Sequence, residues 1–454
     1  MRDKVRIPRV SFACSRERGH LRSKPVTWIV NIAYFLAGVF YVPVLIYQMV
    51  VQGKNRRSWR QRFGHIELPS TARRRIWMHA VSLGEVNCTP ALVSELNSAA
   101  PDCEVVVSTT TDTGYARACT LYPPARVFRC PLDLSWVVGR ALKRIRPSLI
   151  VLVEQEVWPN LVGLAHRRDI PVAVVNGRLT ERSARRLARL GGVTRAMFAR
   201  LAWVGAQDQT IAARFARLGT PSERIEITGS LKWDTAEVAD SVRGADVLAE
   251  SLAIPRDQPL WVCGSTGPGE ETLILDAYEK LLAEGDIGVS LVVVPRKPER
   301  FDEVASLIRS RGFACIRRSE HSDDSPPAQR ASAGTVLLGD TMGELRKFYT
   351  LARAVFVGRS LVPMGGSDPM EVAALAKPVI VGPHMDNFQM PVDRLRAGDA
   401  LEVVHSAAEL AATVAGIVKD GARAEQIGRR ARQVVLDNQG ATARTAQALV
   451  KLLN

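Results

Sequence analysis

The stretch Ile76-Trp77-Met78-His79-Ala80-Val81-Ser82-Leu83-Gly84-Glu85-Val86-Asn87-Cys88 joins a short apolar run, a small turn and a helix start. We predict a buried strand that ends at Ala80 and a helix that begins at Glu85. Open α/β sheets hold their ligands outside the carboxyl ends of their strands, so this order brings a carboxylate to such a crevice. Residues 152–160 repeat the order, with Glu154 and Glu156 between a strand and a helix start. Two acidic groups at one sheet edge indicate acid/base chemistry.

Strands and helices alternate from residue 70 onward. Apolar runs of four to seven residues are separated by helix-length segments, which is typical of parallel strands covered on both faces. The first series of predicted strands is 75–80, 104–109, 125–130, 148–154, 171–176, 201–206 and 225–229. The second series is 259–263, 290–294, 313–317, 335–338, 353–357, 378–381 and 401–404. The pattern predicts an α/β protein of two Rossmann-like domains that face a cleft.

The same alternation predicts where the domains lie. We expect a first Rossmann-like domain at 54–235 and a second at 236–454. The acidic and irregular segment 232–258 is a natural hinge between them. The second domain ends in a long helical stretch with a predicted break at 438–440 and carries a polar surface loop at 320–334.

The N-terminal region differs from the rest in composition. A basic tail, residues 1–26, precedes an anchor segment, 27–53, which has no charge between Lys24 and Lys54. Its length suffices to span a bilayer, so we predict a membrane-associated helix. A helix that enters only one leaflet and a buried core helix are the alternatives.

The charge distribution separates possible partners. The net charge is +15, of which residues 1–75 carry +13 and the remainder +2. A nearly neutral body argues against nucleic acid as a partner, whereas the basic arm favours an anionic membrane surface or an anionic lipid substrate. The seven cysteines have no C-x-x-C spacing, and no Asp-x-Asp pair occurs. We therefore predict neither a disulfide framework, nor a metal site, nor a cofactor.

Glu85 is the predicted general base. The sequence 82–85 is also a capping box, which would open a helix without any catalytic role. A helix N-terminus stabilises a carboxylate, so a useful base at this position needs burial to raise its pKa. Glu154 and Glu156 share a face if the strand continues through them and diverge if the chain turns between them.

The second half offers several strand-to-helix loops that could hold an anion. Residues 264–269 place amides and hydroxyls before a helix at Glu270. Arg296 follows the next strand and provides a cation. In 368–371, Asp368 can cap a helix with Glu371 as its reciprocal partner. The preceding pair of glycines, 365–366, would let a ligand approach the backbone closely.

These motifs resemble those of the lipid A Kdo transferases, which move 3-deoxy-D-manno-octulosonic acid (Kdo) from CMP-Kdo onto a lipid A precursor. The matching stretches are 61–64, 79–85, 154–160, 176–179, 229–234, 295–301, 339–345, 382–384 and 387–388. The resemblance implies an inverting, metal-independent glycosyltransferase of lipopolysaccharide biosynthesis with the GT-B fold. It also implies a place at the cytoplasmic (inner) membrane, with the folded domains on the cytoplasmic face.

The resemblance also assigns roles. It implies that Glu85 takes the proton from the attacking glucosamine hydroxyl and that Glu156 and Lys232 stabilise the transition state. The implied CMP site consists of Pro295, Arg296, Met342, Gly343, Glu344, Asp368, Pro369, Met370 and Glu371.

The sequence departs from the family pattern only in the donor half. The departures are Gly267, Lys297, Arg359, Ser367 and Asp368. They leave two alternatives open: a GT-B transferase that uses a different nucleotide sugar, and a membrane-anchored binding protein with a degenerate donor site.

Overall fold

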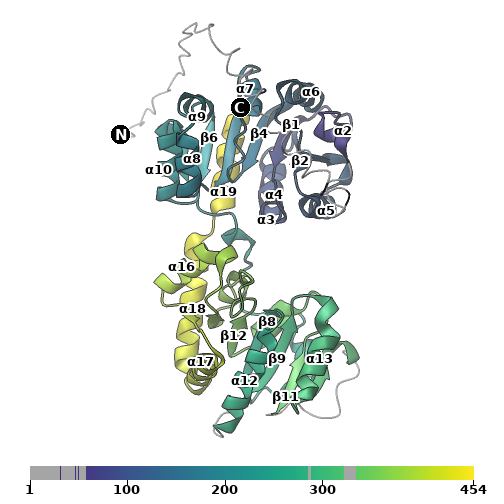
Figure 1. The fold of residues 1–454 in the computed structure, drawn as a ribbon, viewed down its shortest axis with the longest axis vertical. Helices are drawn as coiled ribbons and strands as arrows, with labels where there is room; N and C mark the ends of the chain where they lie inside the picture. Colours follow the sequence, from purple (N-terminus) through teal and green to yellow (C-terminus); the bar gives the residue numbers. More distant parts are fainter. Residues whose placement is uncertain (1–30, 32–46, 48–49, 51–57, 285–287, 322–333) are drawn as a thin grey trace, which may run out of the picture. The chain divides into compact units, whose positions relative to one another are not determined.

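The computed structural model describes residues 31, 47, 50, 58–284, 288–321 and 334–454, which form two compact units (Figure 1). The first unit runs to Asn87, continues through Ala100–Glu226 and includes Leu449–Asn454. The second unit comprises Cys88–Ala99 and Ile227–Ala448. The C-terminal residues therefore return to the first unit, and neither unit is a single continuous segment.

The first unit is built on a parallel sheet of seven strands in the order β3-β2-β1-β4-β5-β6-β7. The strands are β1 (Arg74–His79), β2 (Cys103–Thr109), β3 (Val127–Arg129), β4 (Pro147–Val153), β5 (Val172–Gly177), β6 (Trp203–Ala206) and β7 (Ile225–Ile227). The chain adds strands on one side of β1 and then crosses to β4 on the other side. The resulting switch point between β1 and β4 is where sheets of this kind bind ligands.

Helices cover the first sheet. They are α2 (Trp59–Arg62), α3 (Leu83–Asn87), α5 (Asp112–Leu121), α6 (Ser135–Ile145), α7 (Pro159–His166), α8 (Glu181–Ala188), α9 (Gly192–Phe198) and α10 (Gln209–Leu218). Side-chain caps fix several starts: Thr111, Thr180 and Asp208 each accept a hydrogen bond from a backbone N–H of the first turn. The apolar faces of these helices pack on the strands to form the first core.

The second unit has its own parallel sheet of seven strands, in the order β10-β11-β9-β8-β12-β13-β14. The strands are β8 (Leu260–Thr266), β9 (Ser290–Pro295), β10 (Ala314–Arg317), β11 (Thr335–Leu338), β12 (Ala354–Val357), β13 (Val379–Val381) and β14 (Leu401–Val403). Its switch point lies between β8 and β12, which are paired in parallel.

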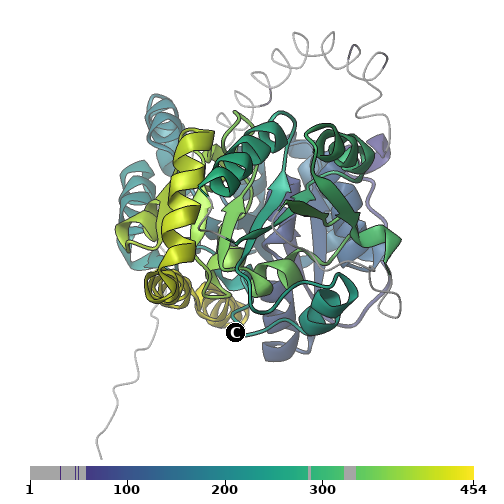
Figure 2. The same cartoon turned by 90° about the horizontal axis from the view of Figure 1, so that it is seen from below.

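Both faces of the second sheet are buried beneath helices (Figures 1 and 2). Along β8, Leu260 and Val262 belong to one core cluster, whereas Trp261 and Cys263 belong to another on the opposite face. The main helices are α12 (Glu270–Ala283), α13 (Phe301–Ser310), α14 (Leu345–Leu351), α15 (Met370–Ala373), α16 (Gln389–Ala397), α17 (Ala407–Lys419) and α18 (Gly421–Asn438). The last helix, α19 (Ala441–Leu453), belongs to the first unit from Leu449 onward. Burial on both faces explains why these strands are continuously apolar.

All fourteen predicted strands are present, with ends displaced by at most a few residues. The predicted break in the terminal helical stretch is confirmed, because α18 ends at Asn438 and α19 begins at Ala441. The predicted hinge segment holds a 3-10 turn, η3 (Trp233–Thr235), and the helix α11 (Ala245–Ser251).

The predicted N-terminal tail and anchor segment lie outside the described residues, apart from Asn31, Tyr47 and Val50, which are helical. Among the residues that the structure describes, no helix is long and apolar enough to cross a membrane. Most of the predicted surface loop at 320–334 also lies outside the described ranges.

Candidate active site

Glu85 lies in α3, directly after the end of β1. Its Oε2 accepts a hydrogen bond from the Val81 N–H and its Oε1 from the Ser82 hydroxyl, each at 2.8 Å. Ser82 Oγ in turn accepts from the Glu85 N–H at 3.4 Å, so the capping interaction is present. Burial raises the pKa of Glu85, and the bonds from Val81 and Ser82 oppose that increase. The residue therefore caps its helix and is also the desolvated carboxylate that a base at this position requires.

Glu156 follows β4, the neighbour of β1 in the sheet. The chain turns directly after the strand, because Glu154 has a positive φ of 63°. Of the two predicted alternatives the structure thus shows the turn, which separates the directions of Glu154 and Glu156. Burial raises the pKa of Glu156 to about 7, and the negative charge of Glu85 adds to the increase.

Glu85 and Glu156 form an unequal pair of carboxyl groups. Glu85 accepts two hydrogen bonds from its own loop, which favour its ionised form. Glu156 accepts one, from the indole Nε1 of Trp158 at 2.9 Å, which lowers its pKa only in part. Since like charges resist joint ionisation, Glu156, whose pKa is about 7, is the group of the pair that takes up a proton as the pH falls through neutrality.

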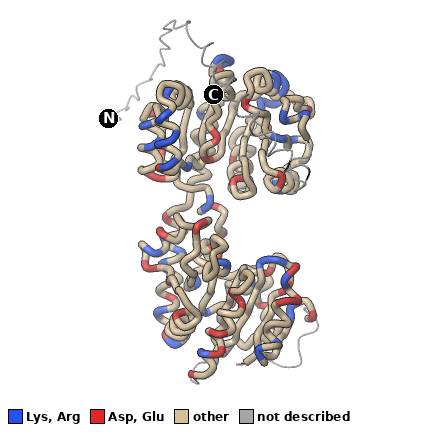
Figure 3. The backbone as a smooth tube through the Cα atoms, in the orientation of Figure 1, with Lys and Arg blue, Asp and Glu red and all other residues tan. Residues whose placement is uncertain are grey.

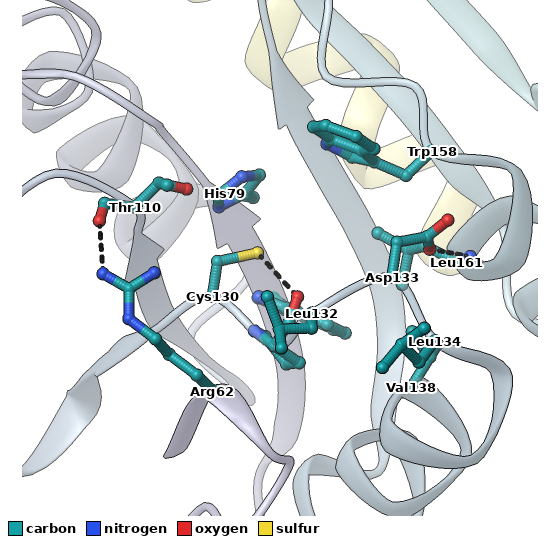
Figure 4. Close-up of a pocket in the computed structure, with 12 residues that line it drawn as sticks. Arg62, His79, Thr110, Cys130, Leu132, Asp133, Leu134, Val138, Trp158 and Leu161 are labelled. Carbon is teal, nitrogen blue, oxygen red and sulfur yellow. Dashed lines mark hydrogen bonds between the residues drawn. The ribbon is translucent and has the colours of Figure 1, made fainter. Parts of the chain in front are cut away.

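An apolar cavity of about 360 Å³ lies at the same sheet edge (Figure 4). Its lining is Arg62, Trp77, His79, Thr110, Cys130, Pro131, Leu132, Asp133, Leu134, Val138, Trp158 and Leu161. No single stretch of sequence contains this cavity, because its walls come from α2, β1, the residue after β2, the segment 130–138 that leads into α6, and the start of α7. Arg62, Trp77, His79 and Trp158 lie within the sequence motifs described above, and the other lining residues lie outside them.

Two polar residues at neighbouring strand ends are structural. Asn160 is 4% exposed, and its Nδ2 donates to the backbone oxygen of Asp133 at 2.5 Å and to Asn31 Oδ1 at 3.1 Å. Asn176, with a φ of 53°, accepts at its Oδ1 from Gln207 Nε2 at 3.0 Å. The side-chain amides of Asn160 and Asn176 thus stabilise the loops around them by hydrogen bonds.

In the second unit, the predicted anion site at 264–269 is taken by the protein's own carboxylate. Glu270 is fully buried, and its Oε2 accepts from the Gly267 N–H at 3.2 Å. Its two oxygens also accept from three successive N–H groups that follow β12, those of Arg359, Ser360 and Leu361. The expectation of a free anion site at this helix start was therefore wrong, since Glu270 uses these amides to join the loops at the switch point.

Four charged residues converge at the carboxyl end of this second sheet. Burial raises the pKa of Asp368 to about 7, and Glu371 adds to the increase. Lys232 and Arg296 are near enough to oppose it. Burial also raises the pKa of Glu371, against the attraction of Arg346 and Arg296. Two carboxyl groups and two cations of the predicted site thus share one region of the second unit.

The expected helix start at 368–371 differs in detail. Helix α15 begins at Met370 and its N-cap is Pro369, one residue later than predicted. Asp368 Oδ1 accepts from the Met370 N–H at 2.8 Å, which supplies the capping bond from the position before the cap.

In the turn Met342-Gly343-Glu344, the side chain of Met342 is exposed and the side chain of Glu344 is hydrogen-bonded to other residues of the protein. Met342 is 72% exposed, and Gly343 has a φ of 87° with no neighbour crowding its Cα. Although burial alone would raise the pKa of Glu344, hydrogen bonds from Arg318, Thr341 and Lys347 lower it to about 2. The Glu344 carboxylate therefore has its hydrogen-bond partners within the protein. The backbone at Gly343 is the part of the turn that a ligand can reach.

The glycine pair 365–366 serves internal packing. Gly365 has a φ of 81°, and a Cβ there would lie 2.3 Å from Asn387 Nδ2. At Gly366 a Cβ would lie 2.3 Å from Met385 Sδ. The loop that follows β13 lies where side chains at these positions would be, which explains the two glycines without a ligand, and the approach of a ligand to them stays a prediction.

The structure thus brings Glu85 and Glu156 together in the first unit, and Lys232, Arg296, Asp368 and Glu371 together in the second. Within the residues described, no group of three or more His, Cys, Asp or Glu side chains is arranged to hold a metal ion. The charged side chains that the structure describes at the two switch points are carboxyl groups, a lysine and an arginine.

Other proteins of known structure also contain two parallel α/β sheets in one chain. A glycosyltransferase from Rickettsia africae has the same fold, with a TM-score of 0.54 at 12% identity over 84% of this chain and 99% of that one. Together with the sheet order, this similarity defines the chain as a protein of the GT-B glycosyltransferase fold.

Sequence comparison narrows this class. Residues 57–235 match the family model described as 3-deoxy-D-manno-octulosonic-acid transferase (kdotransferase). The chain is 34% identical to the 3-deoxy-D-manno-octulosonic acid transferase of Haemophilus influenzae, over 82% of this chain and 86% of that protein. It is 33% identical to that of Bordetella pertussis, with the same coverage of both. The chain belongs to the 3-deoxy-D-manno-octulosonic-acid transferase family and is an enzyme, a glycosyltransferase.

Proposed function

We propose that this protein transfers Kdo from CMP-Kdo to a lipid A precursor in lipopolysaccharide biosynthesis. The observation that carries the proposal is the unequal pair Glu85 and Glu156 at the β1/β4 switch point, in a chain of the Kdo transferase family. Such a pair offers a base and an acid at one place, which is what transfer to a sugar hydroxyl requires.

In the proposed reaction, a glucosamine hydroxyl of the acceptor attacks the anomeric carbon of Kdo. Its proton moves to Glu85, the new C–O bond forms, and the bond from the anomeric carbon to the phosphate oxygen breaks. CMP leaves with that electron pair. A single displacement of this kind inverts the anomeric configuration, so the configuration of the product, determined by NMR, tests this part of the proposal.

Charge developing on the leaving phosphate needs stabilisation. We assign this to Lys232 and Arg296, which lie together beside Asp368, and to protonated Glu156 as a hydrogen-bond donor. Because a single phosphate leaves, these groups suffice without a divalent cation. Transfer that persists at full rate in excess EDTA would support this, whereas loss restored by Mg²⁺ would contradict it.

The donor site in this proposal comprises Pro295 and Arg296, the turn 342–344, and residues 368–371. Its support is the clustering of Arg296, Asp368 and Glu371 around the end of β9 and the start of α15. The open backbone at Gly343 leaves room for a nucleotide. Two acidic side chains near a phosphate are unusual, and Asp368 favours the donor only in its protonated form.

We also propose that the first unit docks on the anionic cytoplasmic face of the inner membrane. Trp136 is 55% exposed on α6, the same helix that ends in Lys143 and Arg144. Arginines are also concentrated on α8 (Figure 3). Exposed tryptophan with basic side chains favours an anionic interface. Co-sedimentation with phosphatidylglycerol vesicles, reduced in Trp136→Ala and absent with neutral vesicles, would support docking.

The central experiment compares wild type, Glu85→Gln and Glu223→Gln in transfer from CMP-Kdo to a tetraacyl lipid A precursor. Glu223 is an exposed glutamate of the first unit and serves as the matched control. We expect Glu85→Gln to lose about 10²–10⁴-fold in kcat with CMP binding retained, and Glu223→Gln to match the wild type. CMP binding without Kdo transfer would indicate a different sugar or acceptor, and no CMP binding would contradict the proposed donor.

A further inference from the structure

Most of the lining of the cavity beside the glutamate pair is apolar or electrically neutral, and Arg62 and Asp133 are its charged residues. Burial lowers the pKa of His79 to about 4, so its ring is uncharged near neutral pH, and Nδ1 is already bonded to Ser108 Oγ at 2.9 Å. Burial likewise raises the pKa of Cys130, which keeps its thiol protonated. Indole, leucine, valine and proline side chains form most of the remaining surface (Figure 4).

The two charged side chains of the lining, Asp133 and Arg62, make hydrogen bonds to the protein backbone. Both carboxylate oxygens of Asp133 accept hydrogen bonds at the start of α7, from the Asn160 N–H at 3.0 Å and the Leu161 N–H at 2.8 Å. Arg62 is 7% exposed, and its Nη2 donates to the backbone oxygen of Thr110 at 3.0 Å. A ligand in this cavity would therefore meet an apolar wall, and a polar ligand would lose its hydration without replacement.

One wall of the cavity is also a hydrogen-bond donor to the proposed active site. Trp158 lines the cavity with its ring and donates through Nε1 to Glu156 Oε2 at 2.9 Å. Its ring is 39% exposed, so apolar surface remains for a ligand to cover. A group bound in the cavity consequently lies one side chain away from Glu156.

We infer that this cavity binds one acyl chain of the acceptor lipid and thereby positions the acceptor sugar beside the glutamate pair. The identity of the lipid rests on the proposed function; the apolar nature of the ligand rests on the lining. The sugar and its acyl chains are covalently joined, so a chain held next to Trp158 limits how far the attacking hydroxyl can lie from Glu85. Leu134, the N-cap of α6, and Val138 within α6 line the cavity, and the last turn of the same helix carries the cations Lys143 and Arg144, which suit a phosphorylated acyl lipid.

Binding is tested first without any transfer reaction. The full-length protein is titrated by calorimetry with a lysophosphatidic acid that carries one tetradecanoyl chain, below its critical micelle concentration, and with glycerol phosphate. Leu134→Trp fills the cavity, and Leu190→Trp, at a position 61% exposed elsewhere in the first unit, is the matched control. Thermal unfolding and CMP binding show whether each variant is folded.

We expect the acyl probe to bind wild type and Leu190→Trp with a negative heat-capacity change, and glycerol phosphate not to bind. Leu134→Trp should bind about tenfold more weakly, as displacement of about two methylene groups implies. Equal binding by Leu134→Trp and wild type, or no binding by the wild type, would overturn the inference. Binding of glycerol phosphate alone would assign the site to a phosphate and overturn it as well.

Transfer then separates this inference from the proposed function. With an acylated acceptor, Leu134→Trp should raise KM about tenfold, whereas a deacylated acceptor should show the same KM in all three proteins. An equal rise in KM for both acceptors would contradict the acyl-chain role. If no protein transfers Kdo, the proposed function fails while the calorimetry still decides what the cavity binds.

Discussion

Trp158 Nε1 donates a hydrogen bond to Glu156 Oε2 at 2.9 Å, and this single bond connects the apolar cavity of the first unit to its glutamate pair. The bond lowers the pKa of Glu156, whereas burial and the negative charges of Glu85 and Glu154 raise it. Changing it should therefore alter the pH dependence of the reaction.

Trp158→Phe removes the bond and keeps an aromatic ring. The pKa of Glu156 should rise, because a hydrogen bond to a carboxylate favours its charged form. If Glu156 acts as a proton-bearing stabiliser, the decline of kcat/KM at high pH should move to higher pH. The measurement is the pH profile of wild type, Trp158→Phe and the control Trp136→Phe, whose tryptophan is exposed on α6. A profile that stays in place or moves to lower pH would contradict this role.

Glu156→Gln and Glu156→Ala distinguish a neutral donor from a required charge. The amide of glutamine can donate a hydrogen bond as a protonated carboxyl does, whereas alanine cannot. We expect Glu156→Ala to lose about 10²-fold or more in kcat, and Glu156→Gln to lose much less and to lack the high-pH decline. Equal losses in the two variants would show that the ionised carboxylate of Glu156 is needed.

Asp368→Asn should stabilise the protein at alkaline pH. Its pKa rises from an ordinary value of 3.8 to about 7 on folding, so the folded state binds more protons in this interval and stability falls as pH increases through it. Thermal unfolding at pH 5 and pH 8 should show a smaller loss in Asp368→Asn than in wild type. Asp386→Asn, at an exposed position, is the control.

The same substitution should change CMP binding. Above pH 7 the wild type places an ionised carboxylate among the cations that we assign to the phosphate, so its affinity for CMP should decline as pH rises from 6 to 8. Asp368→Asn should show a flatter dependence. An identical pH dependence in the two proteins would remove Asp368 from the donor site.

Gly365→Ala should destabilise the second unit. A residue with a side chain would adopt a φ of 81° and place its Cβ 2.3 Å from Asn387 Nδ2. The strained backbone and the clash together should cost about 2 kcal/mol or more, measured by urea unfolding. Gly312→Ala, with a φ of 82° and open space around it, should cost only about 1 kcal/mol. Equal costs would mean that Asn387 moves aside freely.

Much of the fold could be predicted, because a parallel strand that is buried on both faces appears in the sequence as a short continuous run of apolar residues. The fourteen strands and the helix break at 439–440 follow from such runs and from Gly440. The capping of α3 by Ser82 and Glu85 was also visible, since it depends on residues only three apart.

Other features depend on contacts between distant segments. Glu270 reaches the N–H groups of residues 359–361, about ninety positions later, and so removes an anion site that its local sequence suggested. Asn387 likewise explains Gly365, which by itself resembled a ligand-binding glycine.

The sequence by itself determined the alternation of elements, the places where carboxylates and cations follow strands, and the family. These are properties of short segments and of their order along the chain. Only the tertiary structure decided that β1 and β4 are neighbours, which brings Glu85 and Glu156 close enough for one charge to raise the pKa of the other. It alone decided that residues from five separate segments enclose an apolar cavity beside them, because burial and electrostatic interaction depend on distance in space rather than along the chain.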